Sequence, residues 1–334
     1  MKPTDFILRI SELGKEHVDI VGKKCANLGE LAKAGFRVPP GFALTLKAYD
    51  EFMKRTGALE EIQSQLKTFK ADPQNPQDLT KFKGLSKSVR EIVESKTMPE
   101  YINDLVTSYY RELCEKTGIE SVSVATRSAG PVSHPGQYET YLHVKGLSQV
   151  KKHITKVWAS SFNTRSLVAR ARKGLPLDYD PIGVAVIEMV NAKAAGIMFT
   201  ACPNTADKSK IFIEGNWGLG ESVVGGNVSP DSWVVDKYSS KIVDSRASVK
   251  EYECRLNPDT GKVEICKVSE EKKQVFCLSD EEVIAIANLG TQIEKHFKVA
   301  QDIEWAVSEE IPSDLFVLQT RPEKFNISIK ISGF

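Results

Sequence analysis

The chain has 334 residues, enough for two or three domains of ordinary size. Hydrophobic residues make up 41% and charged residues 27%, which indicates a folded globular protein. The 45 Lys and Arg residues nearly balance the 44 Asp and Glu residues, for a net charge of +1. This balance lacks the positive excess of proteins that coat nucleic acids, so we expect no nucleic-acid partner.

The sequence shows no sign of a membrane or secretory protein. No apolar run approaches the roughly 20 residues that span a bilayer, and residues 1–5 lack a signal-peptide core. The six cysteines form no CxxC pair, and the five histidines have no metal-ligand spacing. We expect a cytoplasmic protein with reduced thiols, no membrane partner and no histidine-based metal site.

The first half of the chain reads as strand and helix with a helical insertion. A strand is predicted over 6–10 and a helix over about 25–34, and Thr45 is expected to cap a helix that ends near residue 54. Residues 57–118 are mainly helical and polar in pattern. A strand over 121–125 and one long helix over 147–173 follow.

The second half alternates strands with glycine-rich turns. Two strands are predicted over 182–190 and 193–200, around a turn at residues 191–192, and a β-meander over 241–277. The pattern Ser-Asp-Glu-Glu at 279–282 is typical of a capping box and predicts a helix to about residue 297. Two further strands over 299–321 flank a loop near Pro312. The order of elements predicts an α+β fold.

The final two strands place polar residues in a regular pattern. Asp302 and Glu304 share one strand face, as do Gln319 and Arg321 on the next strand. A symmetric hairpin would set Asp302 opposite Arg321 and Glu304 opposite Gln319. Carboxylate and amide oxygens suit Mg²⁺, and a guanidinium suits phosphate. A surface hairpin with an ordinary cross-strand ion pair is the alternative.

Two glycine-containing segments could contact an anion. Gly22 precedes Lys23, Lys24 and a predicted helix, whose N-terminus favours negative charge. Arg127 begins a run of small residues after a strand, typical of a flap over phosphates, and His134 further on is a candidate phosphoryl carrier. Solvated lysines and a polar surface loop remain the alternatives for these segments.

The stretch 142–177 contains no Asp or Glu. Its basic residues are Lys145, Lys151, Lys152, Lys156, Arg165, Arg170, Arg172 and Lys173. A solvated helix face explains most of them, but at least one base could reach a polyphosphate, and Arg165 is the best placed by sequence context.

Several segments, taken in order, resemble the N-terminal nucleotide-binding part of phosphoenolpyruvate synthase and pyruvate phosphate dikinase. They are residues 22–31, 38–42, 136–142, 196–200, 218–221, 301–305 and 318–322. The resemblance spans nearly the whole chain. The flap at 128–136 is short, as in the dikinases, and Glu188 stands where the synthases typically have glutamine.

The resemblance implies an ATP-grasp-like fold of two lobes with ATP and Mg²⁺ between them. The N-terminal lobe would cover residues 1–190, including a helical insertion at 45–118 and a phosphate flap at 126–140. A β-rich lobe with a metal-binding hairpin would cover 191–325, and a tail 326–334.

The resemblance also implies roles for individual residues. Lys24, Arg127 and Arg321 look like the catalytic, phosphate-contacting cations, and Gly136 and Thr140 like the flap contacts to phosphate. Glu188, Met189 and Val190 lie where the family binds adenine. Glu304 and Gln319 look like magnesium ligands, and Asp302 matches a family carboxylate whose role stays open.

The family's enzymes are dikinase-type phosphotransferases, which split ATP to AMP and phosphate and pass the β-phosphoryl group through a phosphohistidine. The family's swivelling histidine domain and acceptor-binding barrel have no counterpart in these residues. We therefore expect a histidine-bearing partner subunit, as in phenylphosphate synthase, with phenol or pyruvate as the acceptor. A piece of a longer single-chain enzyme, the arrangement of rifampicin phosphotransferase, would give the same sequence.

Two other functions remain open at this point. An ATP-grasp ligase that joins a carboxylate to an amine would release ADP. A nucleotide-binding subunit without turnover would release no product, although a complete set of phosphate and metal residues argues against it.

Overall fold

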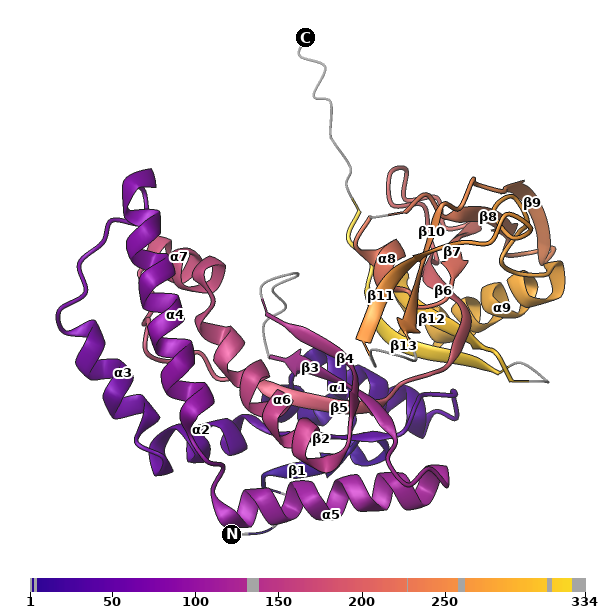
Figure 1. Ribbon diagram of the computed structural model, residues 1–334. Helices are drawn as coiled ribbons and strands as arrows, with labels where there is room; N and C mark the ends of the chain where they lie inside the picture. Colours follow the sequence, from indigo (N-terminus) through magenta and orange to yellow (C-terminus); the bar gives the residue numbers. More distant parts are fainter. Residues whose placement is uncertain are drawn as a thin grey trace. The chain divides into compact units, whose positions relative to one another are not determined.

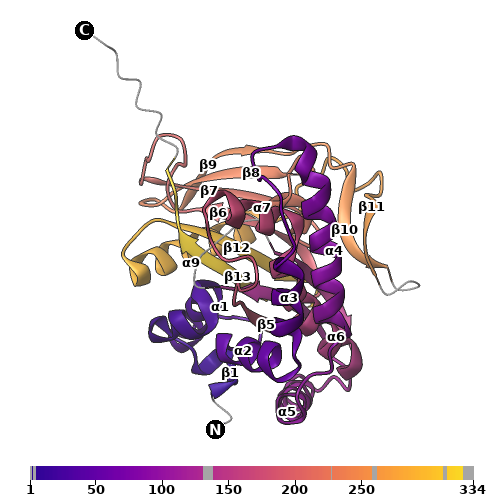
Figure 2. The same ribbon diagram turned by 90° about the vertical axis from the view of Figure 1, so that its left-hand side faces the viewer.

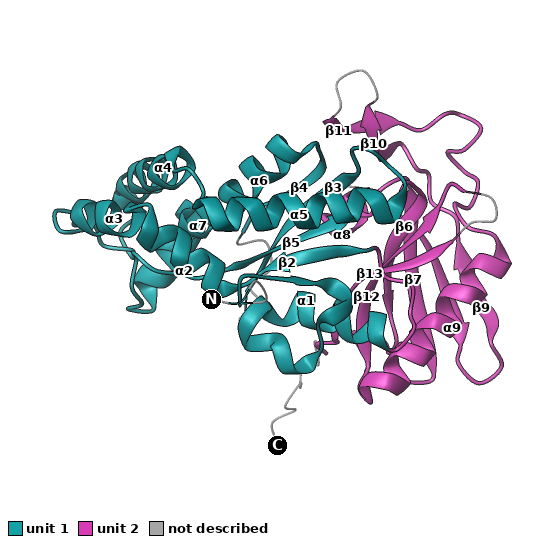
Figure 3. Cartoon of the chain, turned by 90° about the horizontal axis from the view of Figure 1, so that it is seen from below, with its two compact units in different colours: residues 1–33, 40–189 teal, residues 34–39, 190–334 magenta. Residues whose placement is uncertain are grey.

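The computed structural model describes residues 2, 5–130, 138–226, 228–257, 262–310 and 314–325. The chain divides into two compact units, coloured separately in Figure 3. Unit 1 comprises residues 1–33 and 40–189, and unit 2 comprises residues 34–39 and 190–334. Within the described residues, no helix combines the length and apolar character needed to cross a membrane.

Unit 1 is built on a five-stranded antiparallel sheet with helices on both faces (Figure 1). The strand order is β1-β2-β5-β3-β4. The strands are β1 (Ile7–Arg9), β2 (Gly41–Leu44), β3 (Ser123–Ala129), β4 (Thr140–Lys145) and β5 (Gly183–Glu188). The helices are α1 (Val18–Lys33), α2 (Leu46–Arg55), α3 (Ala58–Leu66), α4 (Leu79–Ser95), α5 (Glu100–Thr117), α6 (Leu147–Ala159) and α7 (Thr164–Arg172). Figure 2 views the unit from the side where α3 and α4 run next to each other.

The two faces of this sheet differ in side-chain size. The face that packs into the main core carries large residues, Phe42, Leu44, Val124, Val184 and Val186, which join a cluster with residues of α2, α4, α5 and α6. The opposite face carries small residues, including Ala43, Ala125 and Ala185. Because α1 contacts β2, β3 and β5, these small side chains allow its backbone to approach the sheet closely.

Local signals explain where several helices begin. The Thr45 hydroxyl accepts a hydrogen bond from the backbone N–H of Ala48 and caps α2, as predicted. The predicted single helix over 147–173 is wrong, because a 3-10 turn at Ser160–Phe162 separates α6 from α7. Asn163 then caps α7 through the N–H of Ser166. An Asn side chain that can bond the backbone in this way favours a new helix start.

Unit 2 is built on a six-stranded antiparallel sheet in the order β13-β12-β6-β7-β8-β9. Its strands are β6 (Ala192–Phe199), β7 (Lys210–Trp217), β8 (Asp231–Asp236), β9 (Lys241–Arg246), β12 (Gln301–Ser308) and β13 (Leu315–Pro322). Strands β10 (Tyr252–Asn257) and β11 (Lys262–Lys267) form a separate ribbon. The helices are α8 (Glu221–Val224) and α9 (Asp280–Phe297).

Helix α9 covers one face of this sheet. Ser279 and Glu282 form the predicted capping box at its start. A methyl group on Gly290 of α9 would lie 2.7 Å from the sulfur of Met198, so α9 packs against the face that carries Met198 and its cross-strand neighbour Ile303. Residues at alternate positions, including Glu304, therefore lie on the other face.

Two strand predictions need correction. Strands β5 and β6 do not form a hairpin around residues 191–192, because β5 pairs with β2 and β3 in unit 1 and β6 with β7 and β12 in unit 2. The predicted meander over 241–277 is also divided, since β9 joins the large sheet whereas β10 and β11 form a two-stranded ribbon. Turn residues 258–261 of the ribbon lie outside the described residues.

Candidate functional site

The predicted register of the last hairpin is confirmed. Asp302 lies opposite Arg321, and Glu304 lies opposite Gln319 in the β12–β13 pair. The register shifts by one residue between Glu304 and Trp305. Such a bulge locally twists and re-aims a strand, and bulges are common next to functional sites. The irregularity therefore falls directly beside the two predicted magnesium ligands.

Hydrogen bonds hold the four polar side chains of the hairpin in two pairs. Gln319 Nε2 donates to Glu304 Oε1 at 2.8 Å. Arg321 Nε donates to Asp302 Oδ2 at 2.7 Å, and Arg321 Nη2 lies 2.6 Å from the same oxygen. The Arg321 side chain is 47% exposed and that of Asp302 only 14% exposed. Asp302 thus orients a guanidinium that stays accessible to a ligand.

The pairing of strands adds a third carboxylate to this face of unit 2. Glu304 lies opposite Ile197 of β6, and Ile197 lies opposite Glu214 of β7. The side chains of directly paired residues lie on the same face of a sheet, so Glu304, Ile197 and Glu214 form a row across three strands. The strands of Glu304 and Glu214 are two strand spacings apart, or roughly 10 Å. Burial raises the pKa of Glu214. Sequence reasoning missed Glu214, because its place depends on which strands become neighbours.

A second buried carboxyl, Glu323, follows directly after β13. Burial raises its pKa to about 7, and the nearby carboxylates of Asp302 and Glu294 act in the same direction. The backbone of Ala201 and the charge of Lys237 oppose this rise without cancelling it. Glu323 therefore titrates near neutral pH close to the Asp302–Arg321 pair.

In unit 1, Gly22 marks a break in the path of α1. Its φ of 80° and ψ of 160° are not helical, so the chain changes direction just before Lys23 and Lys24. A methyl group on Gly22 would lie 2.5 Å from the carbonyl oxygen of Gly130. The glycine turn predicted from the sequence therefore lies against the end of β3, at the start of the predicted flap.

This close approach brings two predicted cations into one neighbourhood. Burial raises the pKa of the Cys25 thiol to about 12, and the charges of Arg127 and Lys24 both act against that rise. Both positive charges therefore act on the same buried thiol. Arg127 also pairs with Thr140 across β3 and β4, so the predicted flap arginine and flap hydroxyl are cross-strand neighbours.

The chain passes from unit 1 to unit 2 within the predicted adenine segment. The N–H of Glu188 donates to Pro40 O and the N–H of Met189 to Ser123 O, each at 2.9 Å. Glu188 and Met189 belong to unit 1 and Val190 to unit 2. The other flap residues named from the sequence, Gly136 and His134, lie outside the described residues.

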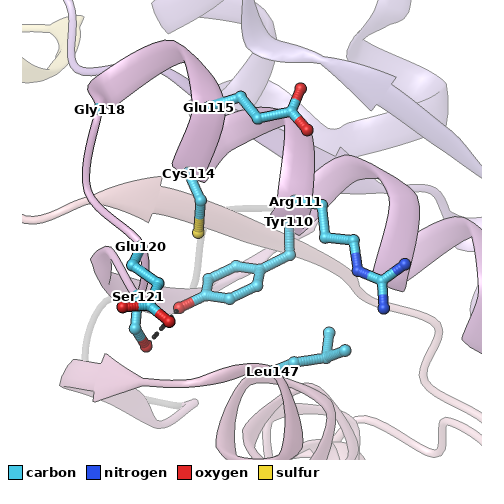
Figure 4. Close-up of a pocket in the computed structure, with 8 residues that line it drawn as sticks. All are labelled: Tyr110, Arg111, Cys114, Glu115, Gly118, Glu120, Ser121 and Leu147. Atoms are coloured by element: carbon cyan, nitrogen blue, oxygen red, sulfur yellow. Dashed lines mark hydrogen bonds between the residues drawn. The ribbon is translucent and has the colours of Figure 1, made fainter.

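The described chain also contains a pocket away from the predicted site residues. A surface pocket of about 570 Å³ in unit 1 is lined by Tyr110, Cys114, Ser121 and Leu147, among others (Figure 4). None of the predicted site residues lines it. Across the described residues, no three His, Cys, Asp or Glu side chains are grouped as a metal site. A metal at the hairpin would therefore need oxygens from Gln319 and from a ligand, as is usual for Mg²⁺.

The chain thus combines helices and sheets, with lysines after a glycine turn in unit 1 and a hairpin of carboxylate, amide and guanidinium groups in unit 2. The chain belongs to the family described as the pyruvate phosphate dikinase AMP/ATP-binding domain, whose model matches residues 18–330.

Curated relatives carry the name phosphoenolpyruvate synthase. The protein named "Probable phosphoenolpyruvate synthase" in Staphylothermus marinus is 38% identical over 353 residues, which cover 96% of this chain and 42% of that protein. The protein of the same name in Methanothermobacter thermautotrophicus is 36% identical, covering 96% of this chain and 46% of that protein. The "Phosphoenolpyruvate synthase" of Pyrococcus furiosus is 35% identical, with coverages of 95% and 43%. The chain thus spans less than half the length of these relatives.

Proposed function

We propose that this chain is the ATP-binding and ATP-cleaving part of a dikinase-type phosphotransferase with an ATP-grasp-like nucleotide fold. The observation that carries the proposal is the hairpin, where the register pairs Glu304 with Gln319 and Asp302 with Arg321. Membership in a family described as AMP/ATP-binding supports the same function. The N-terminal lobe of the proposal is residues 1–190 and the β-rich lobe is residues 191–325.

In this proposal the side chains of unit 1 act on the phosphates of ATP. Lys24 follows the Gly22 turn, and Arg127 lies near the same thiol, so two positive charges gather at one place. Two cations offset the charge that builds on the phosphate oxygens as a phosphoanhydride bond breaks. Thr140, opposite Arg127, supplies a hydroxyl to the same phosphates, and the backbone of Gly136 in the flap a further contact.

The hairpin of unit 2 contributes the metal and a third cation. The carboxylate of Glu304 and the amide oxygen of Gln319 are ligand types that Mg²⁺ accepts, and few protein ligands suffice when phosphates complete the shell. Bound Mg²⁺ neutralises polyphosphate charge. Asp302 holds the guanidinium of Arg321 at 2.7 Å, which restricts the arginine to one orientation before the ligand binds. The segment Glu188–Val190 holds the adenine.

The product of cleavage would be AMP and phosphate, with the β-phosphoryl group passed to a histidine on another subunit or on a further part of a longer protein. The final acceptor would be a small molecule such as pyruvate or phenol.

Two observations would favour other functions. ADP as product would indicate a carboxylate–amine ligase, and nucleotide binding without turnover would indicate a sensing subunit.

The metal assignment is tested by binding. A non-hydrolysable ATP analogue is titrated by calorimetry into the wild-type chain and into Glu304→Ala, with and without Mg²⁺. We expect Mg²⁺ to strengthen binding to the wild type and to have no such effect on Glu304→Ala. Glu310→Ala is the matched control, because it removes an exposed carboxylate that follows the same strand. Equal Mg²⁺ enhancement in Glu304→Ala would contradict the assignment.

A further inference from the structure

Helix α6 presents a polar stripe formed by Ser148, Lys151, Lys152, Thr155 and Lys156, called here the basic stripe. Their spacing of three, one, three and one places them on one helix face. The apolar side chains Val150, Ile154 and Trp158 lie on another face and are fully buried. The three lysines are therefore held in place by a helix whose other side is fixed in the core.

The basic stripe forms one wall of a pocket of about 490 Å³. The other wall comes from the corner between α4 and α5, including Lys96, Thr97 and Asn103. All residues that line the pocket belong to unit 1, where α6 packs against both α4 and α5. Figure 1 shows these three helices. A volume between roughly 300 and 1,000 Å³ is usual for sites that bind small molecules.

The lining of this pocket holds four lysines and one carboxylate. Lys96 forms an ion pair with Glu61. Glu94, the one carboxylate in the lining, lies 3.7 Å from Arg90, which Glu139 also contacts at 2.7 Å. Among the described residues, no carboxylate lies within ion-pair distance of Lys151, Lys152 or Lys156. The acid-free stretch 142–177 accounts for this, because α6 itself carries no Asp or Glu.

Three such lysines within two turns repel one another. Like charges four residues apart on a helix destabilise it, so Lys152 and Lys156 weaken α6 in the absence of an anion. The hydroxyls of Ser148 and Thr97 and the amide of Asn103 add hydrogen-bonding groups beside the lysines. Ammonium groups together with neutral donors in a concave site are suited to phosphate or carboxylate oxygens.

We propose that this pocket, the basic pocket, binds a small anion that carries several negative charges, either as phosphate groups or as carboxylates. The proposed nucleotide residues Lys24, Arg127 and Thr140 are not among the residues that line it. The acid-free stretch, which the proposed nucleotide site does not use, thereby gains a function.

Calorimetry with two probes tests the proposal. Inorganic pyrophosphate represents phosphate groups and citrate represents carboxylates, each titrated at low salt into the wild-type chain. We expect saturable binding of at least one probe, weakened about tenfold or more in the double variant Lys151→Gln/Lys152→Gln. The matched control is Lys145→Gln/Lys173→Gln, which removes the same charge from the same stretch outside the pocket and should leave binding unchanged. Circular dichroism of both variants checks that the helices remain.

A further variant separates this site from the nucleotide site. Lys24→Ala should retain probe binding if the anion occupies the basic pocket and should lose it if the anion occupies the nucleotide site instead. Labelling with acetic anhydride then locates the probe, which should protect Lys151, Lys152 and Lys156 but not Lys145 or Lys173. The proposal is overturned if neither probe shows saturable binding, or if both double variants lose the same amount of probe affinity. It is also overturned if polyglutamate or RNA binds and neither small probe does.

Discussion

A methyl group at Gly22 provides a sharp test of how the lysine turn is built. Alanine at a φ of 80° and a ψ of 160° enters a backbone region that essentially only glycine occupies, at a cost of about 1–3 kcal/mol, and its Cβ would lie 2.5 Å from the carbonyl oxygen of Gly130. Because the obstacle is backbone, no side-chain rotation relieves the contact. We expect Gly22→Ala to lower the free energy of unfolding by about 2–4 kcal/mol.

The control variant is Gly118→Ala at the end of α5. Gly118 also has a positive φ, of 69°, but nothing lies within 4 Å of the position its Cβ would take. The ψ of Gly118 is 14°, in the left-handed helical region, so this variant carries only the milder strain of that region and no clash, and its cost should stay near about 1 kcal/mol. Urea denaturation followed by far-UV circular dichroism measures both. Equal destabilisation by the two variants would refute the close approach of Gly22 to Gly130. Displacement of the turn should also weaken nucleotide binding in Gly22→Ala alone.

Two further predictions concern the hairpin. Burial raises the pKa of Glu323 from 4.5 to about 7, so the folded state holds a proton that the unfolded state releases between these values, and stability falls as the pH rises through that window. Glu323→Gln should remove this loss of stability. Its free energy of unfolding should exceed that of the wild type by up to about 3 kcal/mol at pH 8 and should differ little from it near pH 4.5. Denaturation at both pH values measures the difference. A pH-independent effect would show that the carboxyl is not buried in this way. Asp302→Asn should cost under about 1 kcal/mol of stability because Arg321 is half exposed, yet it should weaken binding of an ATP analogue by releasing the guanidinium. Analogue affinity equal to that of the wild type would contradict the orienting role of Asp302.

The hairpin shows what sequence reasoning can reach. Alternation along a strand has a period of two, so the shared face of Asp302 and Glu304 followed directly from their spacing, and the short connection fixed their partners. The bulge after Glu304 did not follow, because an extra residue in one strand leaves no mark in the hydrophobic pattern.

Features that depend on distant contacts were not accessible in the same way. The contact of Gly22 with Gly130 joins residues far apart in the chain, and the row from Glu304 to Glu214 requires knowing that β6 lies between β12 and β7. The strands β5 and β6 are both apolar and consecutive, which suggested a hairpin, yet their partners lie in different units. Asn163 was a signal that could have revealed the break between α6 and α7.

The fate of the β-phosphorus of ATP tests the proposed activity most directly. The chain is incubated with Mg²⁺ and β-labelled ATP, with and without a candidate histidine-bearing subunit, and both nucleotides and protein are analysed. The account predicts AMP as the nucleotide product and label on a histidine of the added subunit. ADP as the sole nucleotide product would contradict it.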